Sequence, residues 1–315
     1  MVRAVMKRFA ATVSLILAAA LAASCAGGGA GMEQDGAKTV QTTEQAESGQ
    51  EEEEMLRKKS GNADYSVSEK SCEVDGKELY GVLYKPEAEG KMPLIIFSHE
   101  LGCTHSTGAD YAEYYAKKGI AVYAFDFRGG GYGSRSGNDM SKMSVMTEKE
   151  DLLAVYDEAK TWDFVDTEKI VLLGASQGGY VATIAAFERE DIAGLICIYP
   201  AYLVQDSVKE EFASYDDIPE TFSFLGWFTA GKCYAADVWD YDIYEHMGEY
   251  EKPVLLLHGN RDGVVPSSYS QRASEVFPDA DYHIIKNAGH GFYGRSFDTA
   301  VSYMDEYLYA LGIIK

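Results

Sequence analysis

Short apolar segments that alternate with helical patterns place the strongest constraint on the fold of this chain. These segments are rich in β-branched and aromatic residues and end at Gly, Pro, His or polar clusters. Strands that are apolar along almost their whole length belong in a parallel sheet with both faces covered. The sequence therefore predicts an α/β fold with a mostly parallel central sheet and helices on both faces. The five segments are residues 93–99, 120–127, 169–176, 193–200 and 252–259.

Further strands and helices fit the same plan. Residues 280–286 predict another strand, and residues 71–86 predict an antiparallel pair at the leading edge of the sheet. A helix is expected to open at Thr147, because Glu150 follows it at capping-box spacing. Other helical patterns cover residues 180–190, 268–277 and 297–312.

The segment 201–250 interrupts this alternation and is dense in aromatic and acidic residues. It lies between two strands that are expected to be neighbours, which favours a cap inserted over the C-terminal edge of the sheet. The alternative is a set of connecting helices with a small core of their own. Trp227, Trp239 and Tyr241 are candidates for an aromatic wall of a substrate pocket, although each can equally pack the cap itself.

The N-terminus has the plan of an export signal. Arg3, Lys7 and Arg8 precede an apolar run that is short for a membrane span, and small residues lead to Cys25. This arrangement resembles the lipobox of bacterial lipoproteins, in which the Cys becomes lipidated and N-terminal. The alternative is an ordinary cleaved signal with an incidental Cys.

The following residues are rich in Gly, Gln, Glu and Thr and cannot bury enough apolar surface to offset the entropy of ordering. We therefore expect a signal peptide at 1–24, a disordered acidic tether at 25–60 and a catalytic domain at 61–315. The expected location is extracytoplasmic, with membrane anchorage through a lipid on Cys25.

Charge and cysteine content narrow the possible partners. A formal net charge of −22 argues against nucleic acid and against electrostatic binding to anionic membranes, so a neutral small molecule is the expected substrate. The cysteines after Cys25 match no zinc or disulfide framework. Cys197 is expected to be a small buried side chain, whereas a disulfide among Cys72, Cys103 and Cys233 stays open.

The motif Gly174-Ala175-Ser176-Gln177-Gly178 fits G-x-S-x-G and comes between a predicted strand and a predicted helix. The turn is so sharp that a β-carbon on either side would clash, while the serine is held in a strained conformation with its hydroxyl exposed. Serine is a weak nucleophile and needs a base that an acid orients. Asp262 follows a strand end, and His290 lies in a glycine-flanked loop after the last strand.

The chain order Ser176, Asp262, His290 is that of the α/β-hydrolases. Over roughly residues 70–315 the sequence resembles an α/β-hydrolase serine esterase. "GASQGG", the inserted cap and "YPA" after the next strand make it most similar to the bacterial cinnamoyl (feruloyl) esterases. The resemblance implies a catalytic triad of these three residues and no cofactor.

The stretch "HELGCTH", residues 99–105, has some letters of a zinc-protease signature. A zincin needs His at i and i+4 on a helix, but here the position is Cys103 and a strand leads into the stretch, so no metal is expected. In the resembled family this loop and the residue after the nucleophile supply backbone N–H donors to an oxyanion hole. By position these donors are Leu101 and Gln177. Glu100 stands where Gly is usual, and it is expected to turn outward or to pair with Arg128 or Arg135.

These features predict a serine hydrolase that cleaves carboxylic esters with short or aromatic acyl groups through an acyl-enzyme. A peptidase of the prolyl-oligopeptidase or aminopeptidase type and an acylglycerol lipase are alternatives on the same fold. A catalytically inactive surface binding protein is an alternative of another class, against which the complete set of triad residues argues.

Overall fold

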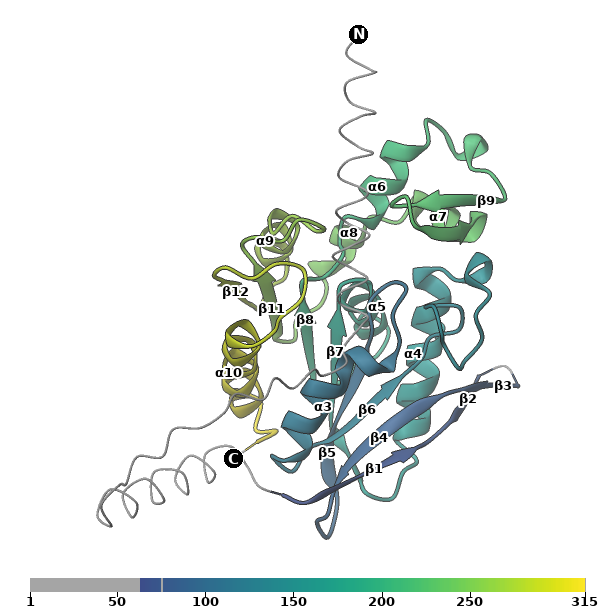
Figure 1. The fold of residues 1–315 in the computed structure, drawn as a ribbon. Coiled ribbons are helices and arrows are strands. Elements are labelled where there is room, and N and C mark those ends of the chain that lie inside the picture. Colours follow the sequence, from purple (N-terminus) through teal and green to yellow (C-terminus); the bar gives the residue numbers. More distant parts are fainter. Residues whose placement is uncertain (1–62, 75, 315) are drawn as a thin grey trace, which may run out of the picture.

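The computed structural model describes residues 63–74 and 76–314 (Figure 1). Its centre is an eight-stranded sheet in the order β1-β4-β6-β5-β7-β8-β11-β12. The β1–β4 and β4–β6 pairs are antiparallel, and every pair from β6 to β12 is parallel. This arrangement confirms the predicted α/β fold with a mostly parallel sheet. The strands are β1 (Tyr65–Glu69), β4 (Gly81–Pro86), β5 (Met92–Ser98), β6 (Ala121–Phe125), β7 (Val165–Ala175), β8 (Gly194–Ile198), β11 (Val254–Gly259) and β12 (Ala280–Ile285).

The leading edge differs from the expected pair. Residues 71–86 divide between a separate small hairpin, β2 (Cys72–Val74) with β3 (Lys77–Leu79), and strand β4. β4 instead pairs with β1, which comes before the predicted segment.

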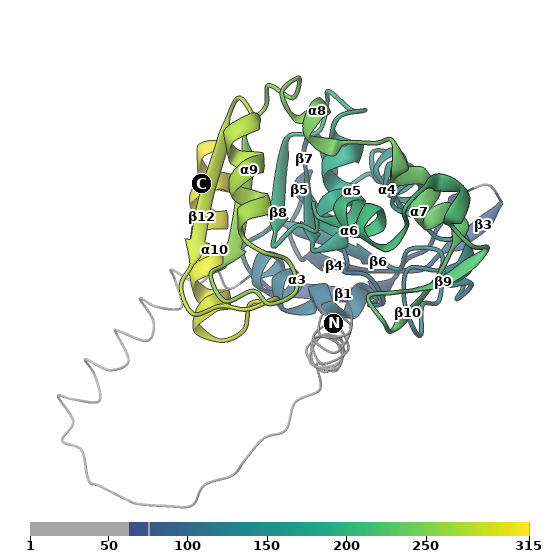
Figure 2. The same cartoon turned by 90° about the horizontal axis from the view of Figure 1, so that it is seen from above.

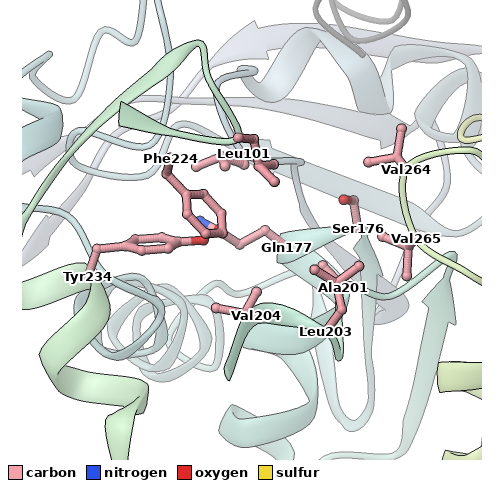
Figure 3. Close-up of a pocket in the computed structure, with 11 residues that line it drawn as sticks. Leu101, Ser176, Gln177, Ala201, Leu203, Val204, Phe224, Tyr234, Val264 and Val265 are labelled. Carbon is pink, nitrogen blue, oxygen red and sulfur yellow. The ribbon is translucent and has the colours of Figure 1, made fainter. Parts of the chain in front are cut away.

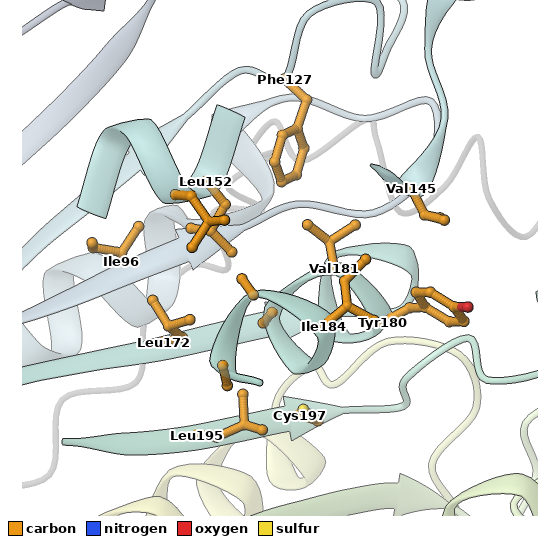
Figure 4. Close-up of a cluster of buried hydrophobic side chains, with 14 of the residues drawn as sticks. Ile96, Phe127, Val145, Leu152, Leu172, Tyr180, Val181, Ile184, Leu195 and Cys197 are labelled. Atoms are coloured by element: carbon orange, nitrogen blue, oxygen red, sulfur yellow. The ribbon is translucent and has the colours of Figure 1, made fainter. Parts of the chain in front are cut away.

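Helices cover both faces of the sheet because alternate strand residues point to opposite sides. Leu94 and Ile96 of β5 belong to one core, whereas Ile95 and Phe97 belong to the other. The first core includes α4 and α5 (Figure 4), and the second includes α3 and α10. The main helices are α3 (Ala109–Ala116), α4 (Val145–Ala159), α5 (Gln177–Ala186), α9 (Ser268–Val276) and α10 (Arg295–Ala310).

The N-cap of helix α4 lies three residues before the predicted N-cap, Thr147. Ser144 is the N-cap: its hydroxyl accepts from the Thr147 N–H, and the Thr147 hydroxyl accepts from the Ser144 N–H. The capping box therefore ends at Thr147 instead of starting there, and Glu150 lies inside the helix.

The segment between β8 and β11 forms the insertion expected at 201–250. Its elements lie beyond one end of the sheet strands (Figures 1 and 2). Their buried side chains, such as Phe228 and Tyr234, belong to the same core as α4 and α5, so this insertion, called the cap below, shares its packing with the main sheet. The cap consists of α6 (Val204–Glu211), a 3₁₀ turn (Tyr215–Asp217), β9 (Thr221–Phe224), β10 (Phe228–Gly231), α7 (Lys232–Trp239) and α8 (Ile243–Met247).

Two 3₁₀ turns lie in the loops beside this end of the sheet, His105–Gly108 and Met140–Lys142. Among residues 63–74 and 76–314, no helix has both the length and the apolar character needed to cross a bilayer. Cys25 and the boundaries expected at 24 and 60 lie outside the described residues.

Candidate active site

Ser176 occupies the turn between β7 and α5 with φ 52° and ψ −117°, a conformation that non-glycine residues rarely adopt. The glycines beside it are required by close backbone contacts. A β-carbon on Gly174 would lie 2.2 Å from the Gly178 carbonyl oxygen, and one on Gly178 would lie 2.1 Å from the Ser98 carbonyl oxygen. The turn therefore requires glycine at both positions, and it places Ser176 at the end of the sheet.

The structure brings Ser176, His290 and Asp262 together although they are far apart in the chain. The His290 Nε2 lies 2.9 Å from the Ser176 Oγ, and the His290 Nδ1 lies 2.7 Å from an Asp262 carboxylate oxygen. An Nδ1–H that donates to the carboxylate leaves Nε2 as the acceptor for the serine proton. This is the geometry that a serine nucleophile needs, and the catalytic role of the three residues stays a prediction.

The Asp262 side chain is buried, yet it has several hydrogen-bond donors. Its Oδ1 accepts from the backbone N–H groups of Val264 and Val265, and its Oδ2 faces both His290 and His258. Burial by itself raises the pKa of this carboxyl, but hydrogen bonds from His258 and His290 outweigh it and hold the pKa well below the usual range. Asp262 is therefore ionised and able to orient the imidazole.

His258 is a neighbour of the site that the sequence did not identify. Its Nε2 contacts the Val265 carbonyl oxygen at 2.9 Å. The same nitrogen lies 3.2 Å from the Asp262 Oδ2, while Nδ1 bonds to the Ser270 hydroxyl. Because a carbonyl only accepts, Nε2 carries the proton and Nδ1 accepts from Ser270.

Leu101 and Gln177, the predicted oxyanion donors, both line a pocket that contains Ser176. Gln177 is the first residue of α5, and the first N–H groups of a helix have no acceptor inside it. Both residues thus lie at the pocket that contains Ser176, and the role of their backbone N–H groups stays a prediction.

Glu100 takes neither of the two arrangements expected for it. It is 5% exposed and accepts hydrogen bonds from the Thr107 and Tyr199 hydroxyls at 2.7 and 3.1 Å. Each arginine that was its expected partner binds another carboxylate, since Arg128 pairs with Asp151 and Arg135 pairs with Glu69. The two hydroxyl groups therefore hold the Glu100 carboxylate in place of an arginine.

Tyr199 is the first residue of the "YPA" stretch after β8, and its contact with the site was not predicted. Its backbone has φ 41°, and its ring centroid lies 4.8 Å from that of His290 and 4.9 Å from that of Phe292. Its hydroxyl donates to Glu100. Tyr199 therefore packs against the His290 imidazole and restrains its position.

The two histidines of the stretch 99–105 make ordinary contacts. The His99 Nε2 accepts from the Phe127 N–H, and the His105 Nδ1 lies 2.7 Å from Asp126. Within the described residues, no group of three or more His, Cys, Asp or Glu side chains is arranged to hold a metal ion. Cys72, Cys197 and Cys233 are free thiols, and Cys197 is buried as expected.

The pocket next to Ser176 is lined by the sheet end, the cap and the loop after Asp262 (Figure 3). Its cap side includes Val204, Phe224, Leu225 and Tyr234. The 11 lining residues are Leu101, Ser176, Gln177, Ala201, Leu203, Val204, Phe224, Leu225, Tyr234, Val264 and Val265.

The aromatic residues that were expected to form this wall lie elsewhere and are not among the lining residues. Trp227 packs on Gly102, where a β-carbon would lie 2.7 Å from its ring. Trp239 meets the ring of Tyr215, and Tyr241 stacks on His246 at 4.9 Å. Because each of these three side chains packs against another part of the protein, they support the cap. Phe224 and Tyr234 are the aromatic residues that line the pocket.

Comparisons with known proteins agree with the fold. Mouse palmitoyl-protein thioesterase ABHD10, mitochondrial, is 28% identical over 228 residues, which is 68% of this chain and 73% of that protein. The uncharacterized peptidase YuxL of Bacillus subtilis is 26% identical over 209 residues, covering 63% of this chain and 30% of that protein. The solved structure of Est1E from Butyrivibrio proteoclasticus with bound ferulic acid superposes with a TM-score of 0.68 at 24% identity, covering 76% of this chain and 98% of Est1E.

These likenesses and the topology establish an α/β fold of the serine-hydrolase type and support an enzyme. The model of the prolyl oligopeptidase family matches residues 108–314, well over half of the sequence. The chain therefore belongs to the prolyl oligopeptidase family of α/β-hydrolases.

Proposed function

We propose that this protein is a serine hydrolase that cleaves carboxylic esters with short or aromatic acyl groups through an acyl-enzyme. The observation that carries the proposal is the Ser176 hydroxyl, which is hydrogen-bonded to His290 and opens into an apolar pocket beneath the cap. The likeness to a thioesterase and to a structure with bound ferulic acid supports acyl transfer as the reaction class.

In the proposed reaction the Ser176 Oγ attacks the acyl carbon while the His290 Nε2 takes its proton. Asp262 holds the other imidazole nitrogen and stabilises the imidazolium that forms. The backbone N–H groups of Leu101 and Gln177 bind the oxyanion of the tetrahedral intermediate, and each such donor contributes about 3 kcal/mol in comparable sites. His290 then protonates the leaving alkoxide, and a water molecule deprotonated by the same imidazole releases the acid.

The pocket supports an uncharged acyl group as the substrate portion. None of its 11 lining residues is charged, and about 400 Å³ of space not filled by protein, part of it open to solvent, lies between them. The polar ends of Gln177 and Tyr234 bond to each other. An aminopeptidase would need an acidic side chain for the free ammonium group of its substrate, so the lining favours an esterase over that alternative.

We further propose that the protein is exported, cleaved before Cys25 and held at the cell membrane by a lipid on this residue. The support is the pattern of the N-terminal sequence, in which a basic stretch, an apolar run and small residues lead to Cys25. The acidic segment 25–60 would then separate the catalytic domain from the membrane.

Matched substrates test the reaction class on the full chain in detergent. The substrate panel contains oxygen esters of acetyl, butyryl, feruloyl and palmitoyl groups. It also contains a palmitoyl thioester, and aminoacyl groups as both esters and anilides. We expect acetyl, butyryl or feruloyl esters to be turned over fastest, with little cleavage of any anilide. Anilide cleavage that outpaces the ester of the same acyl group would replace the proposal with the peptidase alternative.

A further inference from the structure

Two hydrogen bonds between buried side chains connect Gln177, the residue after Ser176, to helix α4 and to helix α7 of the cap. Gln177 Nε2 donates to Glu148 at 2.8 Å, and Gln177 Oε1 accepts from the Tyr234 hydroxyl at 2.6 Å. Glu148 belongs to α4, Gln177 to α5 and Tyr234 to α7, and their exposed fractions are 1%, 2% and 0%. We call Glu148, Gln177 and Tyr234 the polar triplet.

We infer that Glu148 and Tyr234 are positioning residues that hold Gln177, and that Tyr234 thereby links the cap to the oxyanion hole. The inference rests on the proposed function, in which the Gln177 backbone N–H binds the oxyanion. A side-chain amide that is hydrogen-bonded at both its nitrogen and its oxygen is restrained against rotation. The Gln177 amide meets this condition, although the Glu148 Oε1 has no partner among the described residues. Because the side chain and the backbone donor belong to one residue, fixing the former restrains the latter.

The geometry of the elbow makes such a restraint useful. Gln177 follows Ser176, whose backbone is held in a rarely adopted conformation, so the start of α5 needs support from its surroundings. An oxyanion donor acts only when it points at the position that the charge will occupy. A hydrogen bond at each end of the Gln177 side chain supplies this support from α4 on one side and α7 on the other.

Helix α7 is itself fixed to the segment that leads into α4. The Ser144 hydroxyl donates to Asp237 at 2.5 Å, and the Cys233 thiol lies 3.5 Å from the Ser141 carbonyl oxygen. Gly231, just before α7, packs so closely on Ser141 that a β-carbon would lie 1.8 Å from the same oxygen. Tyr234 therefore extends from an anchored helix.

Tyr234 also touches the space that the acyl group would fill. Its ring lines the pocket beside Phe224, with centroids 4.8 Å apart, while its hydroxyl points to Gln177 (Figure 3). An acyl group that packs on this ring thus contacts a side chain tied to the oxyanion donor. Tyr234 thereby couples the filling of the pocket to the placement of the Gln177 backbone N–H.

The test measures the rate at which a small fluorophosphonate labels Ser176 in the full chain, because this reaction needs the triad and the oxyanion donors but no particular acyl group. Tyr234→Phe keeps the ring and removes the hydroxyl, and Glu148→Met removes the acceptor. We expect each to lower the labelling rate about tenfold, since a misplaced donor loses much of its effect. With a good ester, kcat should fall by a similar factor while KM changes less than about twofold.

Conservative and control variants separate positioning from general stability. Glu148→Gln keeps a carbonyl acceptor and should restore most of the rate that Glu148→Met loses. Tyr180→Phe removes another completely buried hydroxyl, one on α5 that has no hydrogen-bond partner among the described residues, and should label at the wild-type rate. Thermal unfolding of each variant confirms that the folded protein is compared.

The outcomes distinguish the inference from the proposed function. A folded Tyr234→Phe protein that labels at the wild-type rate overturns the inference, whatever happens to Glu148→Met. If Glu148→Met does not fold, the labelling rates of Tyr234→Phe and Gln177→Met test the inference. Gln177→Met removes both side-chain hydrogen bonds but keeps the backbone N–H donor, so it should label more slowly than wild type. A wild-type protein whose Ser176 is not labelled at all contradicts the proposed function instead.

Discussion

At the scale of single residues, the site depends on how each side chain of the candidate triad is supported. Ser176 is held by the turn between two glycines, and Asp262 by two backbone N–H groups and His258. His290 is held by its hydrogen bond to Asp262 and by packing against the tilted Tyr199 ring. These contacts leave the imidazole one orientation, with Nε2 toward the serine hydroxyl.

Replacing Ser176 by Ala should abolish fluorophosphonate labelling, because the variant lacks the Oγ that attacks the phosphorus of the reagent and displaces fluoride. Replacing His290 by Ala should lower ester turnover on the order of 10⁴-fold, as the loss of a triad base does in comparable enzymes. Ser98→Ala is the matched control, since this buried serine lies on the neighbouring strand and its hydroxyl has no partner among the described residues. Labelling and hydrolysis that persist in Ser176→Ala would show that another residue is the nucleophile.

At the scale of elements, α4 carries buried carboxyl groups toward the site. Asp151 binds Arg128, and Glu148 binds the Gln177 side chain. Burial raises the pKa of Asp151 to about 6 even though Arg128 lowers it. Burial also raises the pKa of Glu148 well above its usual value of 4.5, because the hydrogen bond from Gln177 compensates only in part.

This environment of Glu148 predicts a pH-dependent difference in stability. Above pH 4.5 the folded protein still holds the Glu148 proton that the unfolded chain has released, so the free energy of unfolding falls as the pH rises toward the folded pKa. Glu148→Gln lacks this proton. Its stability relative to wild type should therefore increase with pH, by up to about 1.4 kcal/mol per pH unit within this window.

Urea unfolding of both proteins at pH 4, 5, 6 and 7 measures that difference. Glu150→Gln on the same helix serves as the reference for an exposed carboxyl. A Glu148→Gln difference that stays constant from pH 4 to pH 7 would mean that Glu148 is ionised in the folded protein.

At the scale of the whole molecule, two long-range arrangements define the site. The parallel strands bring the loops after β7, β11 and β12 to one end of the sheet, where Ser176, Asp262 and His290 meet. The cap between β8 and β11 closes the same end and shares the core of α4 and α5. Its buried side chains make it part of the domain rather than a loose addition.

The proposed anchor is tested on the whole chain. We expect the mature protein to begin at a lipidated Cys25 and to enter the detergent phase on phase separation, because more than one acyl chain gives stable membrane attachment. Cys25→Ser should move the protein to the aqueous phase. Mass spectrometry that finds an unmodified mature N-terminus at another residue would contradict the anchor.

The sequence alone determined the features that short-range chemistry controls. The apolar segments around 93–99 and 169–176 became β5 and β7 because only a covered parallel sheet accommodates such strands. The glycines around Ser176 marked the elbow, since the turn has no room for β-carbons. The order of Ser176, Asp262 and His290, each after a strand end, placed the candidate triad before any distance was known.

Only the tertiary structure decided which distant groups meet. The partners of Glu100 are Thr107 and Tyr199, and no local pattern distinguishes these hydroxyls from the two arginines that were expected. Aromatic residues occur throughout the cap sequence, and nothing in that sequence shows which of them face the pocket. In the structure Phe224 and Tyr234 face it, whereas Trp239 faces Tyr215. Side-chain direction there depends on how α7 packs against α4, and such packing between elements far apart in the chain leaves no periodic trace in the sequence.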